Sequence, residues 1–307
     1  MRGGRRLGTA IGLAAIAATA AAPACAQSIE PRSYSAAPVG TNFFILAYAN
    51  AKGGLSVDPS LPIEDPRIKT SGVIAAYAAT FDLFGKTGKI DVIIPYGKLS
   101  GEAFFRGEHV ERQIVGFGDP LGRVTVILIG APAMSPAEFA TYRQAFLLGV
   151  SLQVAAPFGL YDETRLLNLG QNRWSFKPEL GMSKSWGPLT VELAGSATLE
   201  TANNDFLLAT RRTQKPIYTG QAHLIYNLPR GTWAAATITY LTGGETSIDG
   251  VSKGNLQRNW RAGLSLAVPV TRAMSIKLNA SKGVSARTGN NFDLYGVALQ
   301  YRWISGM

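Results

Sequence analysis

The stretch that decides the fold is FDLYGVALQYRW, residues 292–303, where apolar and polar side chains alternate almost to the C-terminus. One side of this segment carries Tyr295, Val297, Leu299, Tyr301 and Trp303, and the other carries Gly296, Ala298, Gln300 and Arg302. Alternation with a period of two predicts a half-buried strand. An apolar side that ends on aromatic residues, at the end of the chain, is typical of the last strand of an outer-membrane β-barrel.

The same pattern recurs along the chain. It predicts twelve strands, at residues 42–50, 70–83, 89–98, 114–128, 144–156, 174–185, 189–200, 217–228, 232–242, 257–268, 275–284 and 292–303. Most of these segments have the length that a tilted strand needs to cross a bilayer, about ten residues. The predicted fold class is therefore all-β: a transmembrane antiparallel β-barrel of about 12 strands of the outer-membrane type, spanning residues 42–303.

The connections between these segments alternate in length. Tight turns are expected at 84–88, 186–188, 229–231 and 270–273, and longer loops at 51–67, 157–173, 201–216 and 243–256. Outer-membrane barrels have short turns on the periplasmic side and long loops on the outer side. An even number of strands then returns both termini to the periplasm, and the 157–173 loop is the first candidate for a constriction.

Two features fit this pattern less well. Residues 129–143 form a long segment on the short-turn side, where Pro136-Ala137-Glu138-Phe139 can begin a short helix. Pro95 and Pro178 lie within predicted strands, and each deletes one hydrogen bond of a strand ladder. We expect these prolines to mark strand ends or bulges.

A soluble β-sandwich also has alternating strands, but two observations favour the barrel. Aromatic residues lie at segment ends, as belts at two lipid–water interfaces require: Phe84, Trp174, Trp186, Trp233, Trp260 and Trp303. The predicted outward faces are apolar in every segment, and the opposite faces carry Arg, Lys, Glu and Gln. A wet interior and an apolar exterior are the reverse of a soluble domain.

The N-terminus predicts export. Arg2, Arg5 and Arg6 precede the uncharged segment 7–21, and Ala24-Cys25-Ala26 supplies the small residues of a cleavage site. Residues 1–26 are therefore expected to be a signal peptide, and residues 27–41 a short lead-in to the barrel rather than a plug domain. The apolar segment is shorter than the roughly 20 residues of a membrane-spanning helix.

Removal of this peptide takes away three arginines and no acids, which lowers the formal charge from +10 to +7, and also removes the chain's one cysteine. The remaining basic residues are spread along the whole length rather than gathered in one patch. A nucleic-acid partner is therefore not expected. The expected partners are outer-membrane lipid and lipopolysaccharide, small solutes and the barrel-assembly machinery.

Several short segments of the sequence resemble those of the meta-pathway of phenol degradation family, a set of predicted outer-membrane proteins. These segments lie at residues 38–42, 58–62, 80–85, 116–120, 130–133, 168–181, 221–223 and 287–289. The resemblance implies an outer-membrane channel linked, through the family's name, to uptake of aromatic compounds, and it brings no catalytic motif. The chain continues past Trp303 to Met307, which departs from barrels whose last residue is the aromatic.

A barrel of twelve strands lies between small filled barrels and wide porins, so inward side chains decide what passes. The candidates for solute contact are Asp91, Arg123, Gln153, Arg173, Lys177, Glu179, Glu192, Gln221, His223, Asn259, Arg261, Lys277 and Arg302. Arg173, Lys177 and Glu179 share one face of a strand. They form either a charged constriction that orients a polar solute or a salt-bridge network that keeps the barrel rigid. His223 either gates by titration or hydrogen-bonds to neighbours such as Gln221.

No enzyme, metal site or cofactor is expected. His109 and His223 are the only histidines and the mature chain has no cysteine, which argues against zinc. The acidic loop residues lack the spacing of a calcium loop. No serine accompanies a histidine in a hydrolase pattern, and no glycine-rich phosphate loop follows a strand into a helix.

The sequence thus predicts an outer-membrane channel for passive uptake of small compounds, with aromatic or hydrophobic molecules as the expected class. Two alternatives stay open: a general porin, and a barrel with a filled lumen that serves as a scaffold or a surface-binding protein. Interlocking charged pairs in the lumen favour the scaffold, and a continuous pore favours transport. Apolar residues along the lumen favour hydrophobic substrates.

Overall fold

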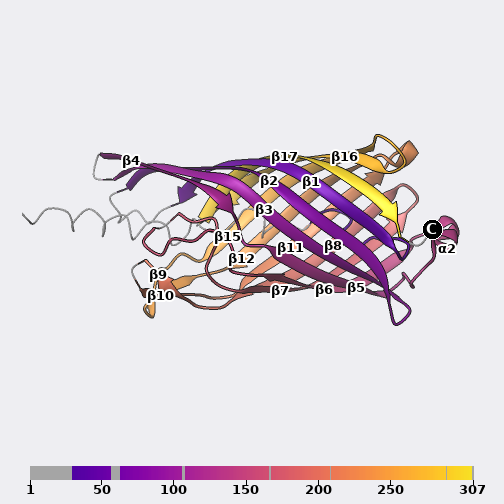
Figure 1. The fold of residues 1–307 in the computed structure, drawn as a ribbon, viewed down its shortest axis with the longest axis horizontal. Helices are drawn as coiled ribbons and strands as arrows, with labels where there is room; N and C mark the ends of the chain where they lie inside the picture. The colour runs from indigo at the N-terminus through magenta and orange to yellow at the C-terminus, as the bar shows by residue number, and fades with distance from the viewer. Residues whose placement is uncertain are drawn as a thin grey trace, which may run out of the picture.

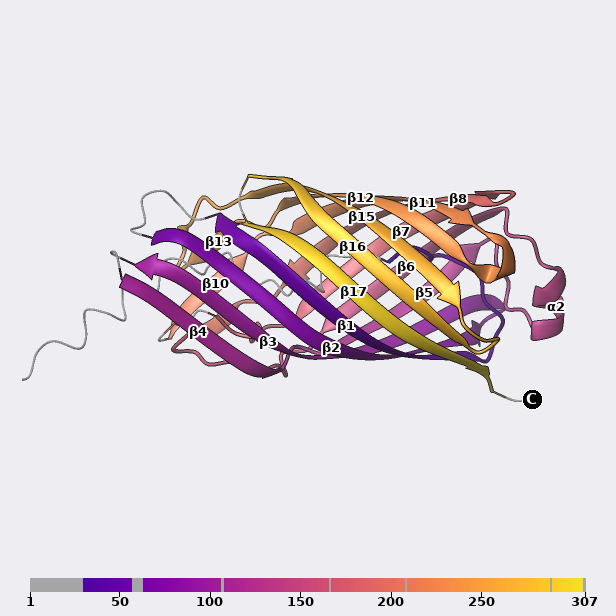
Figure 2. The ribbon, with the colours of Figure 1, turned by 90° about the horizontal axis from the view of Figure 1, so that it is seen from above.

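The computed structural model describes residues 30–56, 63–105, 108–165, 167–207, 209–287 and 289–305. The expected signal peptide therefore lies outside the described residues. In the described part, one antiparallel sheet closes into a long barrel (Figures 1 and 2). No helix among these residues is long and apolar enough to span a membrane.

The wall is built from thirteen strands in twelve places, because β4 and β5 both pair with β3. Closure comes from the pairing of β2 with β3 at one seam and of β1 with β17, the first and last strands, at another. Around the barrel the strands are β1 (Thr41–Ser56), β2 (Ile63–Leu83), β3 (Lys86–Phe105), β4 (Glu108–Phe117) with β5 (Leu121–Ile129), β6 (Phe146–Ala155), β7 (Ser175–Trp186), β8 (Leu189–Glu200), β11 (Ile217–Asn227), β12 (Trp233–Gly243), β15 (Gln257–Pro269), β16 (Met274–Ala286) and β17 (Gly289–Ile304). The twelve-stranded barrel predicted from the alternation is confirmed.

The predicted strand 114–128 is divided into β4 and β5, and Pro95 lies where this happens. The β3 ladder pairs Ile93 with Leu121 of β5 and resumes at Tyr96 with Phe117 of β4. Between them the chain leaves the ladder at residues 118–120, and the Gly118 N–H donates to the Pro95 carbonyl over 3.0 Å. A proline has no N–H to donate to a neighbouring strand. Pro95 lies where β3 changes partner from β5 to β4, so the missing donor interrupts neither ladder.

Pro178 interrupts a second ladder. Its pairing with Leu152 of β6 belongs to a continuous register. The β7–β8 ladder, in contrast, passes from Phe176–Leu199 directly to Glu179–Ser196. The ring nitrogen of Pro178 therefore faces β8, where no hydrogen bond is made. Both prolines thus lie at ladder interruptions, as the sequence predicts.

Lipid-facing aromatic residues form the expected belts, with one correction. Trp186 is 55% exposed near the short turns, and Trp174 and Trp260 are 41% and 44% exposed near the opposite end. Trp233 is only 9% exposed and packs with the buried Ala235 and Ala267. It opens β12 in the inward phase, so its assignment to the belt was wrong.

The two ends of the barrel differ. The short-turn end carries the predicted helix as α2 (Pro136–Thr141), which Ser135 and Glu138 cap reciprocally, and the single turn η3 (Pro229–Gly231). The long-loop end carries a separate four-stranded sheet of β9 (Asn203–Phe206), β10 (Thr210–Gln214), β13 (Thr246–Ile248) and β14 (Val251–Ser252). Figure 1 shows these groups at opposite ends of the barrel.

We predict very different costs for two glycine substitutions at the short-turn end. Both Gly130 and Gly187 have positive φ, +94° and +56°. A methyl at Gly187 meets nothing within 4 Å, so Gly187→Ala should lower the free energy of unfolding by about 1 kcal/mol through backbone strain alone. At Gly130 the methyl overlaps the Phe146 carbonyl, so Gly130→Ala should cost markedly more. Urea midpoints of the refolded barrels in detergent compare the two, and equal midpoints would contradict the prediction.

Candidate functional site in the barrel lumen

The segment Glu30–Gly40, which we term the lead-in segment, lies inside the barrel. Its partners are inward-facing residues of strands far along the chain. Glu30 forms an ion pair of 2.6 Å with Lys277 of β16, and the Arg32 N–H donates to Glu192 of β8 over 2.7 Å. The sequence had shown only that this segment is too short to be a separate plug domain. Its position in the lumen was not foreseen.

Arg32 fixes the turn at the start of the lead-in segment. Its guanidinium donates to the Asn227 side chain over 2.6 Å and lies 5.3 Å from the centre of the Trp233 ring. The buried position of Trp233 is thereby explained as a cation–π partner. Arg32 has a φ of 72°, in the left-handed region, which costs a non-glycine residue about 1–2 kcal/mol. The turn is therefore held by its contacts rather than by its intrinsic conformation.

Tyr34 is the most deeply inserted side chain of the lead-in segment, with 2% of its surface exposed. Its hydroxyl donates to Glu179 of β7 over 2.8 Å and lies 3.3 Å from the Ser151 hydroxyl of β6. Its ring packs on Gly149 and Gly181, which are paired across β6 and β7. A side chain at Gly181 would overlap the ring. We call these four residues, Gly149, Ser151, Glu179 and Gly181, the tyrosine notch.

An apolar cluster surrounds the tyrosine notch at the short-turn end. It contains Tyr34, Ile127, Ala131, Met134, Leu147 and Ala194, all buried, with Phe139 of α2 and Tyr142 packed against it. The Val39 N–H also donates to the Met134 carbonyl over 2.8 Å. The lead-in segment and the β5–β6 connection therefore pack together across the short-turn end of the lumen.

The inner faces of β3, β5, β6, β7, β8 and β11 form a charged wall. Arg123 donates to Asp91 over 2.8 Å, and Lys177 lies 3.8 Å from Glu179. Lys177, Glu179, Glu192, Gln221 and His223 are all buried. The predicted charged residues thus meet one another and the lead-in segment, as in the network interpretation, and Glu179 additionally holds a phenol hydroxyl.

Across the barrel from β7, β8 and β11, the strands β17, β1 and β2 present an apolar wall. Its inward residues are Ile45, Ala47 and Ala49 of β1, Ile74, Ala76 and Ala78 of β2, and Leu294 and Ala298 of β17. Most of them are half-buried rather than buried, so they border open space in the lumen. The expectation that all inner faces carry charged or amide side chains was therefore wrong for β1 and β2, whereas β17 also carries the inward Gln300. Both faces of β1 and β2 are apolar, which removes the contrast that the alternation needs.

The 157–173 loop folds into the long-loop end of the barrel. Leu167 and Leu169 pack against a cluster of inward residues, Ala51, Ile68, Leu99 and Phe292. These residues belong to β1, β2, β3 and β17, on the far side from the strands that the loop connects. The loop suspected from its sequence thus crosses the mouth of the barrel.

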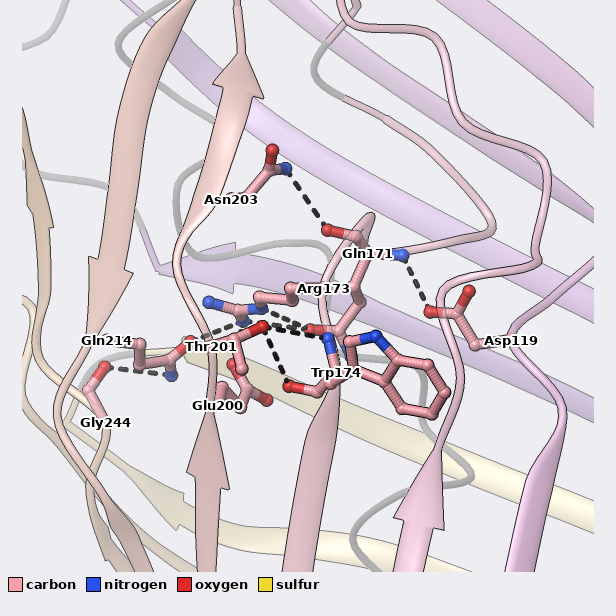
Figure 3. Close-up of polar contacts among 9 residues, drawn as sticks. All are labelled: Asp119, Gln171, Arg173, Trp174, Glu200, Thr201, Asn203, Gln214 and Gly244. Atoms are coloured by element: carbon pink, nitrogen blue, oxygen red, sulfur yellow. Dashed lines mark hydrogen bonds and ion pairs between the residues drawn. The ribbon is translucent and has the colours of Figure 1, made fainter.

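Asp119 and Arg173 anchor this loop (Figure 3). The Asp119 carboxylate accepts the N–H groups of Gly159 and Gln171 over 2.9 and 2.8 Å. Arg173, 4% exposed, pairs with Glu200 and donates to the side chains of Gln171 and Gln214. Burial raises the pKa of Asp119 and lowers the pKa of Arg173, and Glu200 opposes the shift at Arg173. Arg173 therefore acts as a clamp between the loop and β8.

The remaining candidates take separate places. The His223 Nδ1 lies 2.8 Å from the Thr237 hydroxyl, and Gln221 donates to Thr239 over 3.0 Å. Arg261 donates to Ser281, Asn259 is buried, and Gln153 is half-buried on β6. Arg302 is exposed and donates to the Arg272 carbonyl at the short-turn end. Within the described residues no three potential metal-binding side chains lie together.

A depression of about 400 Å³ lies on the lipid-facing side of the charged wall, over β6, β7, β8 and β11. It is lined by Val150, Ser151, Pro178, Glu179, Leu180, Gly195, Ser196, Ala197 and Tyr218. Ser151 and Glu179 therefore border both this depression and the tyrosine notch. The wall between them is one strand thick, and its β7–β8 ladder is interrupted at Pro178.

Comparison with known families finds one match to the chain. Residues 65–301 match the family described as "Putative MetA-pathway of phenol degradation". The chain belongs to this family. Comparison with curated proteins finds no match.

Solved structures show the same fold. The COG4313 outer membrane channel from Pseudomonas putida F1 is 20% identical, with a TM-score of 0.77, over 90% of this chain and 100% of that one. The transport unit of the autotransporter AIDA-I from Escherichia coli is 8% identical, with a TM-score of 0.52, over 89% of this chain and 93% of that one. These likenesses establish an outer-membrane type of barrel.

We predict that Asp119→Ala releases the 157–173 loop. The substitution removes the acceptor of two backbone N–H groups, and hydrogen bonds to a charged group contribute about 1.5–3 kcal/mol each. Limited proteolysis of the folded barrel should cut this loop at least about tenfold faster, as a loss of 1.4 kcal/mol requires. Asp205→Ala, at the same end of the barrel, is the control. Equal cleavage rates in the two variants would show that Asp119 does not hold the loop.

Proposed function

We propose that this protein is an outer-membrane channel through which small amphipathic compounds, above all aromatic ones, diffuse passively. The observation that carries this proposal is the lumen with two unlike walls. Its apolar wall on β17, β1 and β2 lies six strand places from the charged wall on β7, β8 and β11. A phenol or benzoate has the same two parts, an apolar ring and a polar group.

The two walls favour this function over both alternatives. A general porin needs a lumen that is wet throughout, which the apolar wall does not provide. A scaffold with a filled lumen would bury the apolar wall, because exposed apolar surface is unfavourable in water. Ala47, Ala49, Ala76 and Ala78 are half-buried instead. The ion pairs fill the lumen beside the charged wall, so the space beside the apolar wall is available to the aromatic ring of a solute.

Closure at both ends makes the proposed channel a gated one. The 157–173 loop crosses the long-loop end, and the lead-in segment crosses the short-turn end. Passage then requires the displacement of each. We place the short-turn end in the periplasm and the long loops outside, by the construction common to outer-membrane barrels. Export by the signal peptide, assembly by the barrel-assembly machinery and contact with lipopolysaccharide belong to the same proposal.

Liposome swelling with two amino acids tests the proposal. Phenylalanine and glutamine are both zwitterions, and they differ in whether the side chain is an apolar ring or an amide. We expect phenylalanine to enter about fivefold faster, since contact that removes roughly 40 Å² of ring from water contributes about 1 kcal/mol. Equal entry of the two would favour a general porin. No entry of either, in the unsubstituted protein and in the double variant Tyr34→Ala/Asp119→Ala that removes both closures, would favour a scaffold.

A pair of variants locates the effect. Ala47→Glu places a carboxylate on the apolar wall and should abolish the preference for phenylalanine, because the ring then meets a charge. Gln153→Glu places the same carboxylate on the charged wall, where the preference should persist. Both residues are half-buried and face the lumen. A preference that survives Ala47→Glu would remove the apolar wall from the transport path.

A further inference from the structure

We propose that the tyrosine notch is a binding site for phenols, that Tyr34 occupies it as a built-in ligand, and that phenolic solutes open the short-turn end by displacing Tyr34. This inference rests on the proposed channel function and adds to it the substrate class and the means of regulation. It follows from the way that the lead-in segment is held.

The notch is shaped for a flat ring. Gly149 and Gly181 face each other across β6 and β7, and the Tyr34 ring occupies the space that their missing side chains leave. A Cβ at Gly149 would lie 2.9 Å from the ring, and one at Gly181 would overlap it. Glycine is the residue that permits so close an approach to a strand. The site thus fits the ring of Tyr34, and it fits any ring of the same size.

The notch also has the partners that a phenol hydroxyl needs. Glu179 accepts a hydrogen bond from the Tyr34 hydroxyl over 2.8 Å, and the Ser151 hydroxyl lies 3.3 Å from the same Tyr34 oxygen. Lys177, 3.8 Å from the other oxygen of Glu179, balances its charge. A hydroxyl bound to a buried carboxylate is a strong hydrogen bond, and a ring without a hydroxyl would leave Glu179 unsatisfied. The site therefore distinguishes phenol from benzene or toluene.

Displacement of Tyr34 frees the lead-in segment at its centre. The contacts on its N-terminal side are polar, and one of them is accessible: the Glu30 side chain is 64% exposed in its ion pair with Lys277. Tyr34 is also the lead-in residue at the core of the apolar cluster that closes this end. Loss of the Tyr34 ring from the notch thus breaks the closure.

The geometry also sets the working concentration. Tyr34 competes with a free phenol as an intramolecular ligand, and a short tether gives an effective concentration of about millimolar. A phenol of equal affinity therefore displaces Tyr34 only near that concentration. The device would open the channel when phenols are abundant and keep it closed otherwise.

The first experiment measures binding of p-cresol, which is the tyrosine side chain without its backbone. Tyr34→Ala empties the notch, so this variant in detergent should bind p-cresol, and toluene should bind about tenfold more weakly for want of the hydrogen bond to Glu179. Saturation-transfer NMR with purified barrel reports both. In the unsubstituted protein the p-cresol signal should grow only near millimolar concentrations. Tyr226→Ala, a lipid-facing tyrosine that is 50% exposed, is the matched control and should not gain a site.

The second experiment measures opening. Single-channel currents are recorded from Asp119→Ala, in which the 157–173 loop is expected to be released and the lead-in segment remains as the closure. Currents of this variant should rise with millimolar p-cresol and not with toluene. With Tyr34→Ala added, the barrel should conduct without p-cresol, and with the milder Tyr34→Phe, which keeps the ring, it should open at lower p-cresol concentrations. Heat-modifiability on gels establishes that each variant is folded.

The outcomes separate this inference from the proposed function. If folded Tyr34→Ala does not bind p-cresol, or binds toluene equally well, the notch is not a phenol site. If p-cresol binds but the current of Asp119→Ala, in which Tyr34 is intact, does not change, the gating is refuted. Phenylalanine-selective swelling would stand in either case, since it depends on the apolar wall. Absence of that selectivity with intact p-cresol binding would refute the aromatic-selective channel and leave the site.

Discussion

The rest of the structure depends on one constraint, the pairing of every backbone group in the wall. In a bilayer an unpaired N–H or C=O costs several kcal/mol, so the sheet has to close. It does so along the full length of β1 and β17, from Thr41–Ile304 to Ser56–Gly289. Pro95 and Pro178 are tolerated because each lies where a ladder changes partner or is interrupted. Closure directs every second side chain into the lumen. These inward side chains are not needed for backbone pairing, so they can be adapted to the solute.

How far the fold could be predicted follows from the range of the interactions. The strands of the wall, the short turns and the helix at Pro136 are encoded by neighbours in sequence and were predicted from it, whereas β9, β10, β13 and β14 lie in segments predicted as loops. The division between β4 and β5 was missed although the sequence marks it twice. Outward residues are odd-numbered before the break, as at Val115 and Phe117, and even-numbered after it, as at Val124 and Leu128, and Gly118-Asp119-Pro120 is a turn signal. The position of Glu30–Gly40 had no local signal at all. Its partners Glu179, Glu192 and Lys277 lie 145 to 247 residues away.

The candidate site divides in the same way. Lys177, Glu179 and Glu192 were found because alternation assigns charged residues to the inner face of a barrel. Alternation gives little contrast where both faces are apolar, so Ala47, Ala76 and their neighbours were not among the candidates for solute contact. Tyr34 and the glycines that receive it carry no motif. The pairing of Gly149 with Gly181 is visible only once the register of β6 and β7 is known.

The charged wall and the lead-in segment explain how a filled lumen can still belong to a channel. Pairs within the wall, such as Asp91–Arg123, are half-buried with both partners on neighbouring strands, so they fix the shape of the barrel. The lead-in segment is different, because it is held from one side by separate contacts worth about 1 kcal/mol each. It also carries strain at Arg32. A segment that is bound by a few small contributions can be displaced without disturbing the wall, since none of its contacts belongs to the ladder that closes the barrel.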